Sequence, residues 1–312
     1  MSANIIDPFN STKLISMNKY LNEMVNLYDS QKFPKVLLLN GKKGIGKFTL
    51  VIHFLNYVYT QNDSNTYSRK DSTININSNF YKQLLNQTNQ DIVFIKAEEN
   101  KNIKIEEIRS LKSTISKSPL SNNPRFIVID EVEFLNESSV NALLKTLEEP
   151  SINNFFILIN NKQAELIKTI SSRCFITNIF LNKSENSSVI DYLVKKNDIE
   201  TFIEYNNDLS PGLFIRYNDF FLKFNISKDD KLLVKINKLL NGYKKIKDKT
   251  LINLISYLID QYFSKLVESN RNSLDLLSKT KLSIFENLND LTLYNLNVNS
   301  VLHSIEIKLK NV

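Results

Sequence analysis

The middle of the chain reads R-F-I-V-I-D-E-V-E-F-L (residues 125–135), N-A-L-L-K-T-L-E-E-P (141–150), F-F-I-L-I-N-N (155–161) and I-S-S-R-C (170–174). An apolar run ends in an acidic pair, an amphipathic segment follows, a second apolar run ends in asparagine, and an arginine closes the series. Short apolar runs are typical of buried strands, and apolar positions at helical spacing are typical of a helix packed on them. The stretch therefore predicts two strands of a sheet with a helix between them.

Strand and helix patterns also alternate on the N-terminal side of this stretch. Residues 35–40, K-V-L-L-L-N, form a buried-type strand, and an amphipathic helix pattern follows it. Residues 92–95 indicate another short strand, residues 105–115 a helix, and residues 13–28 a helix before the first strand. This alternation indicates a parallel, doubly wound sheet with ligands at the carboxyl ends of its strands.

Beyond Thr177 the pattern becomes helical. Residues 189–196 form a short helical segment, the sequence D-L-S-P-G-L follows, and from about Phe221 the chain reads as helix throughout. We expect three parts: an α/β domain over residues 1–178, a small helical lid over 179–220, and an all-helical domain over 221–312.

The composition is that of an ordinary globular protein, with 42% hydrophobic and 23% charged residues. The chain begins without a signal-peptide pattern and has no apolar run long enough for a membrane span, so we expect a cytoplasmic protein. The single cysteine, Cys174, excludes a disulfide framework. The net charge of +7 invites a nucleic-acid interpretation, but Asp and Glu are interspersed among the lysines. We therefore do not expect strong DNA binding by this chain alone.

A glycine-rich segment follows the first predicted strand. Residues 41–47, G-K-K-G-I-G-K, match the P-loop pattern, in which backbone N–H groups cradle phosphates and the lysine, here Lys47, reaches the terminal phosphates. The next position should be Ser or Thr, whose hydroxyl coordinates Mg²⁺, but it is Phe48. Thr49 is turned by about 100° around the helix from that position. The alternative is a turn that binds nothing. The strand–turn–helix context favours a P-loop ancestry and leaves present nucleotide binding open.

Together these segments resemble the AAA+ ATPase module of DNA polymerase clamp loaders, and within it the delta-prime subunits of bacterial DNA polymerase III. The N-A-L-L-K-T-L-E-E-P helix and the S-R-C segment are the most specific elements of this resemblance. The resemblance implies a P-loop domain, a helical lid, and an all-α C-terminal collar through which subunits oligomerise. In the C-terminal part, the resemblance is limited to the helical character of the sequence and to the Y-N-L-N segment near Tyr294. Many relatives carry a zinc insert with cysteine ligands; residues 61–79 contain neither Cys nor His, so we expect no zinc and no other metal site.

The resemblance also implies roles for residues at the strand ends. Asp130 and Glu131 stand where the family places its metal-associated Asp and water-activating Glu, and the alternative is a pair of exposed carboxylates. Asn161 matches the sensing Asn, with Asn160 as the adjacent alternative. A degenerate ATP site would then comprise Gly41, Gly44, Gly46, Lys47, Thr49, Asp130 and Asn161.

The lid sequence departs from that of motor subunits, which carry a second sensing arginine. Here L-S-P-G places Gly212 at that position, and S-P-G is characteristic of delta-prime subunits. A metal ligand and a lid arginine are therefore both missing. Phosphoryl transfer depends on positioned cations, so we predict negligible ATPase activity by this chain, and at most a weak one.

Arg173, in S-S-R-C, is implied to be a finger that enters the ATP site of a neighbouring subunit. Its planar, permanently charged guanidinium suits the bridging of phosphate oxygens. The alternative is an arginine paired with a carboxylate at a domain boundary. Lys145, Glu148 and Glu149 either form a solvated helix face or contact an adjacent subunit, and the sequence leaves both open.

The family implies a stator that works beside gamma/tau and delta subunits, so that the loader places a sliding clamp on primed DNA during replication. The chain would be part of a DNA polymerase holoenzyme without being a polymerase itself. The first alternative is a gamma/tau-type motor that hydrolyses ATP, against which Phe48 and Gly212 argue. An unrelated P-loop enzyme is a second alternative, and it leaves S-S-R-C and N-A-L-L-K-T-L-E-E-P unexplained.

Overall fold

The structure is a computed structural model and describes residues 7–97, 102–115, 123–205, 209–269 and 274–310. Its contacts divide the chain into two compact units. The first comprises Met1–Ile199 with Tyr205–Ile215, and the second comprises Glu200–Glu204 with Arg216–Val312. The three-part division expected from the sequence stays a prediction.

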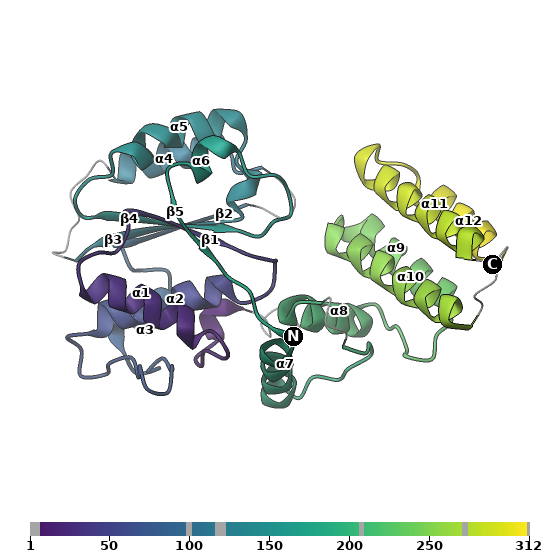
Figure 1. The fold of residues 1–312 in the computed structure, drawn as a ribbon, viewed down its shortest axis with the longest axis horizontal. Helices are drawn as coiled ribbons and strands as arrows, with labels where there is room; N and C mark the ends of the chain where they lie inside the picture. Colours follow the sequence, from purple (N-terminus) through teal and green to yellow (C-terminus); the bar gives the residue numbers. More distant parts are fainter. Residues whose placement is uncertain (1–6, 98–101, 116–122, 206–208, 270–273, 311–312) are drawn as a thin grey trace. The chain divides into compact units, whose positions relative to one another are not determined.

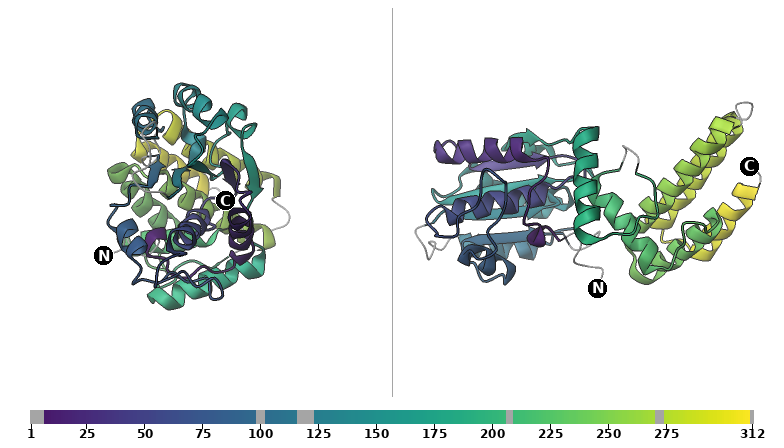
Figure 2. Two further views of the ribbon diagram at one scale, coloured as in Figure 1. Left: turned by 90° about the vertical axis from the view of Figure 1, so that its left-hand side faces the viewer. Right: turned by 90° about the horizontal axis from the view of Figure 1, so that it is seen from below.

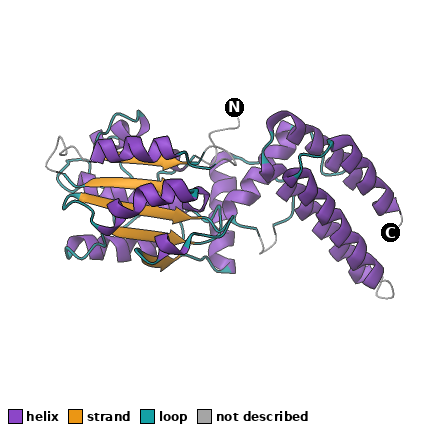
Figure 3. Cartoon of the chain, turned by 90° about the horizontal axis from the view of Figure 1, so that it is seen from above, coloured by secondary structure: helices purple, strands orange, loops and turns teal. Residues whose placement is uncertain are grey.

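The first unit is built on a five-stranded parallel sheet between two layers of helices (Figures 1 and 3). The strand order is β2-β3-β4-β1-β5, and every neighbouring pair is parallel. All residues of β3 are buried, as expected for a parallel sheet that is covered on both faces. The strands are β1 Val36–Asn40, β2 Ile92–Lys96, β3 Arg125–Asp130, β4 Asn154–Asn160 and β5 Phe175–Asn178.

Helices α1, α2 and α3 cover one face of the sheet, and α4, α5 and α6 cover the other (Figure 1). Side chains alternate along β3: Phe126 and Val128 pack in the cluster under the first face, whereas Ile127 and Ile129 pack in the cluster under the second. The helical elements of this layer structure are η1 Pro8–Asn10, α1 Asn18–Asp29, α2 Lys47–Thr60, α3 Asn79–Leu85, α4 Ile105–Ile115, η2 Val132–Phe134, α5 Glu137–Glu148 and α6 Lys168–Ser171.

The two lid helices follow the sheet. The first, α7 Lys183–Asn197, begins with a capping box, in which Asn182 and Glu185 satisfy each other's backbone N–H groups. The second, α8 Pro211–Lys223, has proline as its first residue, where the missing N–H costs no helical hydrogen bond.

The second unit is helical, as the sequence predicts. Helix α9 contacts α10 and α12, and α11 contacts the same two helices, so that each helix has two neighbours (green to yellow in Figure 2). Arg216 and Asp248 form an ion pair at 3.1 Å within this unit. The helices are α9 Leu232–Ile246, α10 Lys249–Ser269, α11 Leu274–Leu293 and α12 Val298–Lys310.

The predicted fold class, a parallel α/β sheet followed by helices, is confirmed, but several details differ. Helix α3 was not predicted, and residues 224–231 interrupt the helical pattern expected from Phe221 onward. The first helix begins at Asn18 instead of residue 13, because Lys13 forms a β-bridge with Thr73. The short strand β5 was not predicted. It lies at the edge of the sheet and is largely exposed, so it lacks the apolar run that marks the other strands.

Candidate nucleotide-binding edge and the Arg173 surface

The glycine-rich loop joins β1 to α2 at the carboxyl edge of the sheet. Gly44 and Gly46 have φ of 80° and 98°, in the left-handed region that favours glycine. Gly41 is equally constrained, because a Cβ there would lie 2.4 Å from the carbonyl oxygen of Ile179. The loop therefore has the backbone geometry for which the P-loop pattern selects its glycines.

Lys47, the first residue of α2, is turned back onto this loop. Its Nζ donates to the carbonyl oxygens of Gly41 at 2.8 Å and Lys42 at 2.7 Å. The side chain is buried, and burial lowers the pKa of Lys47 to about 8, although the nearby carboxylates of Asp130 and Glu133 act in the opposite direction. The ammonium group is thus hydrogen-bonded to carbonyl groups of the same loop.

The lid lies directly on the loop. The Gly212 N–H donates to the Gly44 carbonyl oxygen at 2.8 Å, which satisfies one of the free N–H groups at the start of α8. A Cβ on Gly212 would lie 2.9 Å from both Cα and O of Gly44, so only glycine allows this approach. Ser210 is buried beside Gly44, and its hydroxyl has no hydrogen-bond partner in the described part of the chain.

Phe48 occupies the position of the missing metal ligand and belongs to an aromatic triad. Its ring centroid lies 5.6 Å from those of Phe9 and Phe94, which are themselves 5.4 Å apart. Phe9 comes from η1 and Phe94 from β2. Thr49, one residue further along α2, is half-buried.

Asp130 and Asn161 meet at the ends of β3 and β4. Asn161 Nδ2 donates to Asp130 Oδ1 at 3.1 Å, and the Glu131 N–H donates to the same oxygen at 3.0 Å. Burial raises the pKa of Asp130, which the Lys96 ammonium 3.8 Å from Oδ2 partly offsets. The adjacent alternative, Asn160, instead donates to Asn40 at 3.0 Å.

Glu131 is engaged by the glycine-rich loop itself. Its Oε1 accepts from Lys43 Nζ at 2.8 Å and from Gln163 Nε2 at 3.2 Å. The residue has φ of 58° and is buried, so the alternative of an exposed carboxylate pair is wrong in this structure. The carboxylate already has an ion-pair partner from its own chain.

Glu133 is a further buried carboxylate here, and it was not predicted from the sequence. Its oxygens accept from the backbone N–H of Asn161 at 3.0 and 3.1 Å and from that of Gln163 at 3.3 Å. It thereby holds the turn after β4. The available signal was a third acidic position within D-E-V-E, directly after a buried strand.

These residues do not fit a hydrolysable Mg²⁺-nucleotide. Phe48 offers no ligand atom, Gly212 offers no cation, and Glu131 is paired with Lys43. Among the residues that the structure describes, no group of three or more His, Cys, Asp or Glu could hold a metal ion.

Arg173 lies between α6 and the edge strand β5, two residues before the strand begins. Its guanidinium donates through Nε to Glu148 Oε1 at 2.7 Å, and Glu148 is the last residue of α5. The Arg173 side chain is 32% exposed and that of Glu148 is 46% exposed. Cys174 is half-buried and packs against the core cluster beneath α4, α5 and α6.

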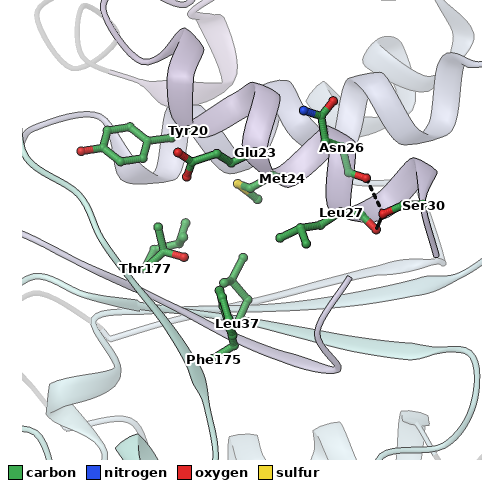
Figure 4. Close-up of a pocket in the computed structure, with 10 residues that line it drawn as sticks. Tyr20, Glu23, Met24, Asn26, Leu27, Ser30, Leu37, Phe175 and Thr177 are labelled. Carbon is green, nitrogen blue, oxygen red and sulfur yellow. Dashed lines mark hydrogen bonds between the residues drawn. The ribbon is translucent and has the colours of Figure 1, made fainter. Parts of the chain in front are cut away.

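A separate cavity of about 430 Å³ opens between α1 and β5 (Figure 4). It shares no residue with the glycine-rich loop. Its lining is mostly apolar and includes Met24, Leu27, Leu37, Leu39, Phe175 and Thr177.

The sheet has the order β2-β3-β4-β1-β5, with a glycine-rich loop before α2, an acidic pair at the end of β3 and an asparagine after β4. Together with the helices that follow the sheet, these features define an AAA+ module. The family model described as "DNA polymerase III, delta subunit" matches residues 16–182. The chain belongs to this family, and it is delta-prime-like within the clamp-loader AAA+ proteins.

Similar curated proteins include subunits named DNA polymerase III subunit delta'. The chain is 30% identical over 175 residues to DNA polymerase III subunit delta' of Buchnera aphidicola subsp. Baizongia pistaciae, covering 52% of this chain and 51% of that protein. It is 27% identical over 231 residues to the delta' subunit of Buchnera aphidicola subsp. Schizaphis graminum, covering 70% and 68%. The chain thus spans from about half to two thirds of these relatives' lengths.

A gamma subunit and a solved structure also match. DNA polymerase III subunit gamma of Buchnera aphidicola subsp. Acyrthosiphon pisum is 30% identical over 53% of this chain and 44% of that protein. A DNA polymerase III gamma subunit-related protein of Thermotoga maritima matches with a TM-score of 0.46 and 18% identity, covering 92% of this chain and 98% of that one. No helix in the described ranges combines the length and apolar character needed to cross a membrane.

Proposed function

We propose that this chain is a clamp-loader subunit that does not hydrolyse ATP itself and supplies Arg173 to the ATP site of a neighbouring motor subunit. Gamma/tau and delta subunits would be its direct partners. The sliding clamp and primed DNA would be reached through the complex, and the work would take place in the cytoplasm beside the replicating chromosome.

The observation that carries the proposal is the difference in solvent exposure between two sets of charged side chains. Lys47, Asp130 and Glu131 are at most 6% exposed and are bonded within the chain. Arg173 stands at the edge strand of the sheet with about a third of its side chain exposed. An arginine that acts in the ATP site of another subunit must be exposed to solvent. Groups that are buried and hydrogen-bonded within the chain are poorly placed to take part in ATP hydrolysis.

The gamma/tau-type motor is the weaker candidate despite the similarity to a gamma subunit. A motor would need a hydroxyl at position 48 and a cation in the lid. Phe48 is packed between two other rings, and Gly212 has no room for a side chain. Any ATP bound by this chain would therefore be held weakly and without the metal contact.

The test is the DNA- and clamp-stimulated ATPase of a reconstituted loader that contains the wild-type chain or its Arg173→Ala variant. Removing an arginine finger should lower turnover at the site that it serves by about three orders of magnitude or more. Arg109, an exposed arginine on α4, provides the matched control as Arg109→Ala. Unchanged turnover in an assembled Arg173→Ala loader, verified by size exclusion, would refute the proposal.

A further inference from the structure

Arg173 is held by acceptors within its own chain. Both Nε and Nη2 donate to the same oxygen, Oε1 of Glu148, with the Nε bond at 2.7 Å. Nη1 donates to the Thr169 carbonyl oxygen at 2.9 Å and to Ser172 Oγ at 3.4 Å. Every nitrogen of the guanidinium therefore has an acceptor in cis.

This arrangement is incompatible with the bridging of two phosphate oxygens. Such bridging uses a pair of adjacent N–H groups along one edge of the guanidinium. The Nε/Nη2 edge faces Glu148, and Nη1 is taken by Thr169 and Ser172. Arg173 must give up at least part of this set before it can engage a neighbour's nucleotide.

The hold on Arg173 is weak enough to be released. Glu148 is the last residue of α5, so the negative end of the helix reinforces its attraction for the guanidinium. Both side chains are nevertheless partly exposed, at 32% and 46%, and exposed ion pairs are screened by solvent and salt. An exposed ion pair of this kind can therefore exchange partners at a small cost in free energy.

We infer that Glu148 is a positioning residue that parks Arg173 in cis while the neighbouring ATP site is empty and releases it when nucleotide binds there. This inference rests on the proposed function of Arg173. The contact of Arg173 with Glu148 competes with its contact with the neighbour's nucleotide. The neighbouring site therefore binds nucleotide less tightly than it would if Arg173 were free. Loss of the Glu148 charge should therefore favour the contact between Arg173 and the nucleotide of the neighbouring subunit.

The test compares Glu148→Gln with its neighbour Glu149→Gln in the reconstituted loader. Glu149 follows Glu148 directly and is exposed, so its variant makes the same charge change without touching Arg173. Binding of a fluorescent, non-hydrolysable ATP analogue should tighten by about two- to fivefold with Glu148→Gln, and the gain should shrink at high salt. Glu149→Gln should leave binding unchanged, and kcat should not fall in either variant.

The same measurements in an Arg173→Ala background separate the possible failures. If Arg173→Ala lowers turnover and Glu148→Gln tightens binding only when Arg173 is present, parking is supported. If Arg173→Ala lowers turnover but Glu148→Gln leaves binding unchanged, parking is refuted and the trans role stands. A fall in kcat with Glu148→Gln refutes parking as well, because Glu148 would then orient the active arginine. If Arg173→Ala leaves turnover unchanged, the proposed function itself fails.

Discussion

The carboxyl edge of the sheet and the Arg173 surface carry the same kinds of charged side chain in opposite environments. At the sheet edge, Lys47 and Asp130 are buried and their hydrogen bonds are made within the chain. At the Arg173 surface, the arginine and Glu148 are partly exposed and bonded to each other. Buried charges of this kind stabilise a fold only as a complete set, whereas an exposed pair can exchange partners at little cost. Under the proposed function, the first region contributes to the stability of the chain and the second contributes Arg173 to a neighbouring subunit.

The largest expected effect on stability is at Phe48. Replacing it in Phe48→Ser removes one ring from the triad with Phe9 and Phe94, so the free energy of unfolding should fall by about 3 kcal/mol. Urea denaturation of the isolated chain measures the change. Phe180→Ser is the matched control, because Phe180 is 64% exposed and should lose less than about 1 kcal/mol. Equal losses would show that the triad contributes no special stability.

The next effect is expected where the lid meets the loop. In Gly212→Ala, the new Cβ would lie 2.9 Å from backbone atoms of Gly44, which cannot move aside as a side chain can. We expect a loss of about 2 kcal/mol in the free energy of unfolding. Ser210→Ala, two residues away, should change it by less than about 0.5 kcal/mol because the buried hydroxyl has no partner. If Gly212→Ala is as stable as Ser210→Ala, the lid does not rest on the loop in solution.

A smaller effect is expected from the protonation of Lys47. Burial places its folded-state pKa at about 8, below the value of an unfolded lysine. Between these two pKa values the folded state holds fewer protons than the unfolded state, so the free energy of unfolding rises with pH. From about pH 7 to about pH 9, the wild type should gain about 1 kcal/mol relative to Lys47→Met. Denaturation curves of both proteins measure this gain, and parallel pH profiles would contradict the buried ammonium.

Most of the sheet could be predicted because the buried strands are continuous apolar runs. V-L-L-L-N, R-F-I-V-I-D and N-F-F-I-L-I-N each coincide with a strand. The family resemblance singled out Asp130 and Asn161 at the ends of two of these strands, and parallel strands bring their carboxyl ends to one edge of the sheet. The strand Phe175–Asn178 could not be found in this way, because an exposed edge strand needs no apolar pattern.

The contacts around the predicted residues were not readable from the sequence. Lys43 reaches Glu131 across 88 positions, and Gly212 reaches Gly44 only because the lid folds back. Glu133 caps the turn after β4 because η2 directs it there. The family resemblance named Arg173, but pairing with Glu148 depends on where α5 ends relative to α6. Such long-range juxtapositions are set by packing, which a local pattern does not encode.

The aromatic triad at Phe48 also bears on how this lineage could change over generations. A return to Ser or Thr at this position would remove a packed ring and leave Phe9 and Phe94 facing a gap. The metal ligand alone would still lack a lid arginine, and Gly212 has no space to become one. Each of these substitutions made alone would therefore lower the free energy of unfolding. If the chain does not hydrolyse ATP, as proposed, packing at Phe48 and Gly212 would oppose the gain of that activity one residue at a time.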